Sequence, residues 1–232
     1  MPCDEPPDTR AGFFGKVSSH GDFVARRLPQ SFQGPWDAWL QAGVQASRQA
    51  LGPRWLTAYL SSPIWRFALA PGVCGASGWG GVLMPSVDRV GRHFPLTLAA
   101  EGAAPLDQMV HHGAWYSRLE ELALSSLREG FSLESFDAAL RALAPLQGSA
   151  PPVNGQSVLA LDPDRPLDDQ LAAPSARLLI AIAAAALDGQ SLWWTDGSAK
   201  VAPCLLVCRG LPAPEAFAAL LDGDWRSHRW GD

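Results

Sequence analysis

The chain has little charge and no apolar run long enough to cross a membrane. Charged residues make up 18% of its 232 residues, against roughly 25% in an average globular protein. Apolar residues reach 47%, which excludes a disordered chain, because disorder needs more charge and fewer apolar side chains. The most apolar helical pattern, Leu178–Leu187, is about half the length that spans a bilayer. Residues 1–10 lack the pattern of a signal peptide, so we expect no membrane insertion.

Basic clusters and metal-binding cysteine patterns are also missing. The formal charge of −5 and scattered Lys and Arg residues give no electrostatic reason for binding nucleic acid. The four cysteines lack the spacing of a disulfide framework or a zinc site. Cys204 and Cys208 fall on one face of an expected strand, where core packing is the expected role. These features predict a protein of the reducing cytoplasm, without cofactors.

The clearest structural signal is a hairpin. Trp79–Val87 and His93–Ala100 read as strands joined by the five residues Asp88–Arg92, so they should pair antiparallel. Neither face of the second strand carries a charged residue, so helices must cover both sides of the sheet. We therefore predict an α/β fold, a three-layer αβα sandwich around a mixed, largely antiparallel sheet, with this hairpin in the middle.

The other expected elements fit one domain over residues 11–232, behind a flexible N-terminus of residues 1–10. A signature region (11–143) precedes a proline-rich irregular excursion (144–174) and the fully apolar, buried helix 178–187. A helix should start at Ser132, with Phe131 packed on Phe136. Further helices are expected from Pro35, near 53–60, over 106–127 and over 213–221, and strands over 12–17, 64–69, 191–195 and 203–208.

Catalytic motifs are incomplete. Gly75–Trp79 misses the last glycine of a nucleophile elbow, and Lys16 precedes the spacer that it would follow in a phosphate-binding loop. No histidine pair has the spacing of a metal site on a helix. For nucleophilic catalysis the candidate groups are Ser77 or Ser86, His20 or His93, and Asp22 or Asp88. A hydrolase or nucleotide-binding enzyme that uses Ser86, His93 and Asp22 is the alternative hypothesis.

Arginine 66 lies between two aromatic residues in an expected strand, Trp65-Arg66-Phe67. A charged side chain in a buried strand needs a carboxylate partner. We predict that Asp22 or Asp88 forms a charge-assisted hydrogen bond with Arg66 or Arg92, and so joins two loops.

Five ordered sequence blocks together resemble the TagF/ImpM family of type VI secretion-associated proteins. They are Gly12–Lys16, Gly21–Val24 with Arg26–Pro29, Trp36–Leu40, Pro63–Phe67, and Gly81–Arg92 running into Phe94–Leu96. The resemblance covers residues 11–143 well, and Leu192–Trp194 shows a weaker similarity beyond this region.

The resemblance implies a three-layer αβα protein that controls type VI secretion after translation, generally as a repressor. It implies a forkhead-associated scaffold protein as partner and no chemistry. Binding is thus the leading hypothesis, ahead of the enzyme and of a structural subunit of the apparatus. Residues expected to frame the motif are Gly21, Phe23, Trp36, Trp39, Trp65, Arg66, Phe67, Pro85, Gly91, Phe94 and Pro95.

The two signature loops, Lys16–Arg27 and Pro85–Phe94, are the expected contact surface, because loops on a rigid sheet commonly carry binding residues. They hold polar residues that core packing does not demand, and we predict that the loops lie together. The candidate partner-binding residues are Lys16, His20, Asp22, Arg26, Ser86, Asp88, Arg89 and Arg92.

Overall fold

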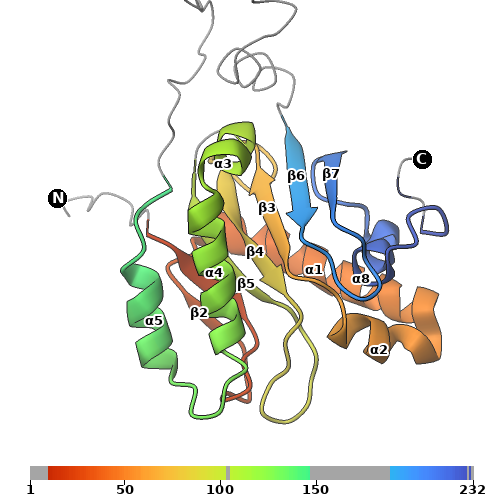
Figure 1. Ribbon diagram of the computed structural model, residues 1–232, viewed down its shortest axis with the longest axis horizontal. Coiled ribbons are helices and arrows are strands. Elements are labelled where there is room, and N and C mark those ends of the chain that lie inside the picture. The colour runs from red at the N-terminus through yellow and green to blue at the C-terminus, as the bar shows by residue number, and fades with distance from the viewer. Residues whose placement is uncertain (1–9, 103–104, 147–188, 229, 231–232) are drawn as a thin grey trace, which may run out of the picture.

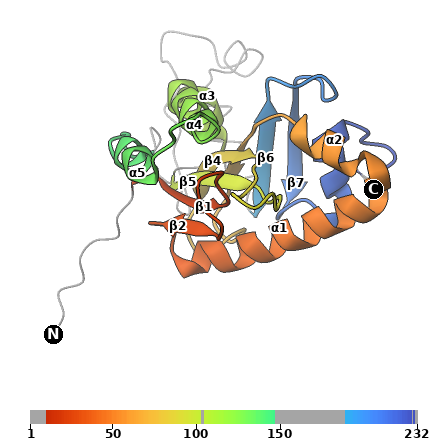
Figure 2. The same ribbon diagram turned by 90° about the horizontal axis from the view of Figure 1, so that it is seen from below.

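The computed structural model describes residues 10–102, 105–146, 189–228 and 230. They form one seven-stranded sheet in the order β2-β1-β5-β4-β3-β6-β7, with helices on both faces (Figures 1 and 2). The elements are β1 (Gly12–Gly15), β2 (Val24–Arg26), α1 (Gln30–Leu51), η1 (Gly52–Arg54), α2 (Trp55–Leu60), β3 (Trp65–Leu69), β4 (Trp79–Met84), β5 (Leu96–Glu101), α3 (Pro105–His111), α4 (Gly113–Ser125), α5 (Leu133–Arg141), β6 (Gln190–Thr195), β7 (Cys204–Arg209), η2 (Pro214–Ala218) and α8 (Ala219–Asp222).

The predicted central hairpin is confirmed in its pairing and its place in the sheet, but the first strand ends earlier and the second begins later than predicted. Residues 85–95 connect them, with one isolated bridge between Val87 and His93. β4 and β5 pair antiparallel from Trp79↔Glu101 to Met84↔Leu96 and lie in the middle of the sheet. Every strand pairing in the described part of the chain is antiparallel, so the prediction of a mixed sheet is wrong there. The reason lies in the connections, because the helical segments join β2 to β3 and β5 to β6, which are not neighbours in the sheet. Neither segment therefore closes a parallel βαβ unit.

Helix α1 runs along one face of the sheet (Figure 2) and starts five residues earlier than the predicted Pro35. It begins at Gln30, and Pro35 lies inside it. The turn ahead of the proline forms because Phe32 is buried and packs with ring centroids 4.4 Å from Trp79 and 5.3 Å from Trp36. This packing offsets the backbone hydrogen bond that a proline removes from a helix.

The core beneath α1 is built from aromatic rings. Trp36 contacts Phe67 of β3 at 4.6 Å and stacks on Trp193 of β6 at 5.9 Å between centroids. Its indole Nε1 donates to Thr97 Oγ1 at 2.8 Å, which satisfies the one polar atom of the buried ring. Trp39 Nε1 likewise donates to the Pro212 carbonyl at 2.8 Å. The tryptophans of the signature blocks are therefore core residues.

Helices α3, α4 and α5 cover the opposite face (Figure 2). Tyr116 of α4 is fully buried. The predicted start of α5 is confirmed, because Ser132 accepts from the Ser135 N–H at 3.3 Å. Phe131 packs on Phe136 with centroids 5.4 Å apart. This second layer completes the predicted αβα sandwich.

The remaining predictions are confirmed in part. The predicted helix 213–221 is a 3₁₀ turn, η2, followed by the short helix α8. Cys204 and Cys208 both pack against the core beneath α1, as their spacing predicts. The helix 178–187, residues 147–174 of the proline-rich excursion and residues 1–9 lie outside the described residues. Among the helices that the structure describes, none combines the length and apolarity of a membrane span.

Candidate interaction site at the paired loops

Two loops meet at one end of the sheet, and the strand register explains why. β1 pairs with β5, so that Gly15 lies opposite Leu96. The chain leaving β1 and the chain entering β5 therefore emerge side by side (Figure 1). The backbone joins them directly, because Arg89 N donates to the His20 carbonyl at 2.9 Å. We call residues 16–23 and 85–95 the paired loops, and their predicted proximity is confirmed.

A buried ion pair fastens the paired loops. Lys16 Nζ lies 2.5 Å from Asp88 Oδ2, and the two side chains are only 6% and 0% exposed. The prediction that packing does not demand Lys16 is therefore wrong. Lys16 directly follows β1, whose residues are buried on both faces of the sheet, and is itself only 5% exposed. The position of its partner, 72 residues away, is set by the fold.

Asp88 also organises its own loop. Its Oδ1 accepts from Val90 N at 3.0 Å and from Arg92 N at 2.8 Å, and its Oδ2 accepts from Arg92 Nε at 2.7 Å. Burial of the carboxylate opposes its charged form, but the bonds from Lys16 and Arg92 outweigh burial and hold the pKa of Asp88 well below its ordinary value. Asp88 is thus an ionised centre around which the loop turns.

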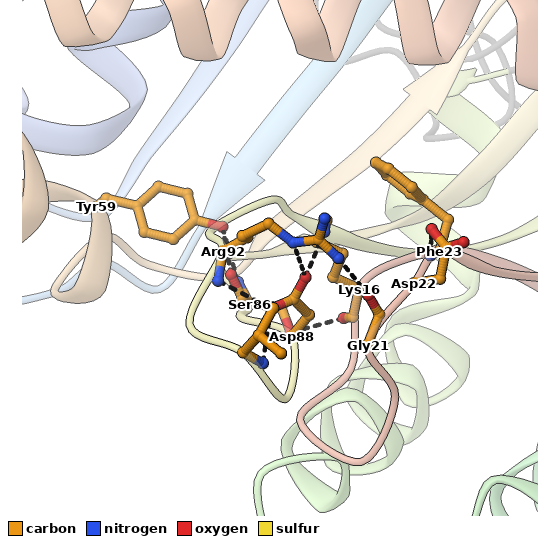
Figure 3. A network of polar contacts seen from close by, with 9 residues as sticks. Lys16, Gly21, Asp22, Phe23, Tyr59, Ser86, Asp88 and Arg92 are labelled. Atoms are coloured by element: carbon orange, nitrogen blue, oxygen red, sulfur yellow. Dashed lines mark hydrogen bonds and ion pairs between the residues drawn. The ribbon is translucent and has the colours of Figure 1, made fainter.

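Further hydrogen bonds complete this polar network, which we define as Lys16, Gly21, Ser86, Asp88 and Arg92 (Figure 3). Arg92 Nη2 donates to the Gly21 carbonyl, and Ser86 Oγ donates to the Lys16 carbonyl at 2.7 Å. Both contacts cross from one loop to the other.

Tyrosine 59 of α2 anchors the network to the body of the protein. Its hydroxyl donates to the Ser86 carbonyl at 2.8 Å and accepts from the Ser86 N–H at 2.9 Å. Burial raises the pKa of Tyr59 far above its ordinary value. The loops are therefore held on a rigid base.

The predicted acid–base contact forms within one loop, between Asp88 and Arg92, so this pair does not itself join the two loops as predicted. Arg66 instead binds Glu120 of α4 with two bonds of 2.7 and 2.8 Å, because the strand alternation turns it to the face that α4 covers. It also contacts Asp196 at 2.9 Å. Asp22 accepts the Phe23 N–H at 2.8 Å and makes no ion pair in the described part of the chain.

Outside the network, the paired loops present apolar and basic side chains. Phe23 is 43% exposed and Val90 65% exposed. The Phe23 ring is held by stacking on Phe14 at 5.6 Å, and Lys16 Nζ lies 4.8 Å from its centroid. Arg89 is exposed, and no ion pair of its side chain is found among the described residues. Exposed aromatic rings and arginines are both enriched in protein contact surfaces.

Two candidate residues differ in position from the rest. His20 is half-buried, with Nδ1 2.8 Å from Ser19 Oγ, and it stays with the loops. Arg26 lies on β2 opposite Phe13 and its Nη1 is 3.8 Å from Asp137 of α5, so the structure removes it from the paired loops. The remaining signature residues, Gly21, Pro85, Gly91, Phe94 and Pro95, belong to the loops or lie beneath them.

The residues of the enzyme alternative are not assembled. The Ser86 hydroxyl is buried and donates to a backbone carbonyl. His93 contacts the rings of Trp55 and Tyr59, with centroids 5.9 and 5.6 Å away. In the described ranges no hydrogen bond joins Ser86, His93 and Asp22, and no group of three or more His, Cys, Asp or Glu side chains lies together as metal ligands do.

Residues 12–143 match the model of the TagF N-terminal domain, described as type VI secretion system-associated. This chain belongs to the TagF family. The fold is also similar to the crystal structure of PA0076 from Pseudomonas aeruginosa PAO1, with a TM-score of 0.78, 42% sequence identity, and coverage of 92% of this chain and 94% of that one. No curated protein matched the chain. The matched TagF segment contains both paired loops and the whole polar network.

Proposed function

We propose that this TagF-family protein is a non-enzymatic, cytoplasmic regulator of type VI secretion. In this proposal it acts after translation, as a repressor, by binding a forkhead-associated scaffold component of the secretion system. The contact surface is the exposed part of the paired loops. The family membership supports the secretion role, and the resemblance described above supplies the expected partner.

One observation carries the choice of surface: the loops are held rigidly, yet their outer side chains are left uncovered. A buried ion pair and three crossing hydrogen bonds hold the loops together. Val90, at the tip of one loop, is 65% exposed and therefore contributes little to packing within the fold. Rigid presentation lowers the entropy lost on association.

The candidate residues then divide into two roles. Lys16, Ser86 and Asp88 are buried and fix the shape of the loops. The residues that reach solvent, and that would touch the partner, are His20, Asp22, Phe23, Arg89, Val90 and Arg92. Arg92 serves both roles, because its side chain is 60% exposed while it binds Asp88. This division corrects the expectation that Lys16 itself meets the partner.

The first experiment is a pull-down with mass spectrometry from a type VI-positive lysate, combined with a secretion assay. The wild-type chain is compared with Arg89→Glu and Val90→Asp. Both changes replace exposed side chains, so thermal melts should stay near that of wild type. We expect both variants to lose the scaffold and to relieve repression.

The matched control is Arg209→Glu, an exposed arginine on β7, at the other edge of the sheet from β2 and β1. It should bind and repress like wild type. Normal binding and repression by folded Arg89→Glu and Val90→Asp would refute the paired loops as the site. Failure of wild type to capture any secretion component would refute the binding function itself.

A further inference from the structure

A second site lies beside α5 and serves no part of the proposed function. It is a surface groove of about 480 Å³ that is lined by residues of β2 and α5. Figure 1 shows these two elements side by side. Charged side chains dominate its lining, which includes Arg10, Arg26, Glu134, Asp137 and Arg141. We call it the Asp137 groove.

Three guanidinium groups meet at the Asp137 carboxylate; those of Arg26 and Arg141 line the groove, and that of Arg27 is buried behind it. Arg27 Nη1 lies 2.5 Å from Asp137 Oδ1. Arg141 Nη2 and Arg26 Nη1 lie 3.4 and 3.8 Å from Oδ2 of the same residue. One carboxylate balances one of the three positive charges, so two remain. Glu134 and Arg10 on the rim carry opposite charges and leave this surplus unchanged.

Arginine 27 is held in an unusual state at the base of this cluster. It is the one residue other than glycine with a positive φ, 58°, in the described part of the chain. Its side chain is only 9% exposed, and Nε donates to the Ala11 carbonyl at 2.9 Å. Its buried Nη2 has no hydrogen-bond partner among the described residues. Backbone strain and an unpaired buried donor are both costly, and both are commoner at functional sites.

We propose that the Asp137 groove binds a phosphate monoester. Such a group carries a charge of about −1.5 to −2 at neutral pH and has three strong acceptor oxygens, which matches a surplus of two positive charges. Arginine forks suit phosphate oxygens in geometry as well as charge. The side chains of Arg26 and Arg141 are 44% and 51% exposed, so they have N–H groups available to a ligand. The phosphate can belong to a small metabolite or to a phosphorylated protein side chain.

The test is an NMR titration of the full chain with inorganic phosphate at constant ionic strength, with chloride as the reference salt. The amide signals of Ala138 and Ala142, which line the groove, are the reporters. We expect saturable shifts with phosphate and none with chloride. Glycerol 3-phosphate and a phosphoserine tripeptide then separate the two sources, because the natural source should bind more tightly than inorganic phosphate.

Substitutions make the test specific. Arg26→Gln and Arg141→Gln each remove a half-exposed guanidinium and leave the buried Arg27–Asp137 pair in place. Each should weaken phosphate binding about tenfold, the usual effect of losing one charge-assisted hydrogen bond. Arg209→Gln, an exposed arginine outside the groove, should leave binding unchanged. Absence of saturable shifts in wild type, or equal affinity in all variants, would overturn the proposal.

Discussion

Removing the Tyr59 hydroxyl tests whether the paired loops are anchored as the structure indicates. In Tyr59→Phe the ring remains, and only the two hydrogen bonds to Ser86 are lost. The Ser86 carbonyl keeps its bond from Phe94 N at 3.1 Å. The buried Ser86 N–H loses the hydroxyl oxygen that accepts its hydrogen bond. A buried unpaired donor costs about 1–3 kcal/mol, and we expect a loss near 2 kcal/mol.

For a chain of this length, about 2 kcal/mol lowers Tm by roughly 4–8 °C. Calorimetry measures this shift, and hydrogen exchange reports the Ser86 amide itself, which should become much less protected. The matched variant is Tyr116→Phe. The Tyr116 hydroxyl donates to the Phe67 carbonyl or Gln108 Oε1, and it accepts from no backbone N–H of the residues that the structure describes. It should cost about half as much.

The reasoning fails if Tyr59→Phe melts with wild type and leaves the protection of the Ser86 amide unchanged. That result would mean that the hydroxyl does not hold the loop. A loss equal in both tyrosine variants would mean that the unpaired N–H carries no special cost.

Three further predictions concern the core and the network. Gly43→Ala should destabilise the protein by about 1–3 kcal/mol in thermal melts, because the new Cβ would lie 2.4 Å from the Phe217 ring. The control is Gly113→Ala, whose Cβ would meet nothing within 4 Å, and it should be neutral or stabilising. Burial raises the pKa of the Cys74 thiol to about 12. Because the thiol ionises more easily in the unfolded chain, the free energy of unfolding should fall as the pH rises above about 9. Cys74 should also resist alkylation at pH 8 until the chain unfolds. Asp88→Asn should lower Tm at pH 7 and make Tm fall less steeply as the pH is lowered. The lowered pKa of Asp88 adds stability at pH values above the ordinary pKa of an aspartate, and this stability is lost as the pH falls. The same decline of Tm in acid for the variant and the wild type would contradict this.

The features that the sequence predicts correctly depend on residues that are close together in the chain. The central hairpin follows from two uncharged strands around a five-residue loop with Gly91. The start of α5 follows from Ser132 and the Phe131–Phe136 pair. Such patterns lie within one short segment of the chain, so they can be recognised without a structure.

Contacts between distant segments are where the predictions fail. Lys16 reads as a loop residue, and only the β1–β5 register brings it to Asp88. Arg66 finds Glu120 because α4 crosses that part of the sheet. Arg26 and Arg27 likewise reach Asp137 across about 110 positions of the chain, and no spacing in the sequence predicts that contact. Arg141, in contrast, lies only four residues from Asp137 on the same helix.

The central claim is that the exposed side chains of the paired loops bind the scaffold. Calorimetric titration of the purified forkhead-associated component of the same secretion system into the wild-type chain and into Arg89→Glu tests it directly. Reversing one charge at the centre of an interface costs about 2 kcal/mol or more, so we predict at least about 30-fold weaker binding with an unchanged melt. Equal Kd values for the two proteins would contradict the account.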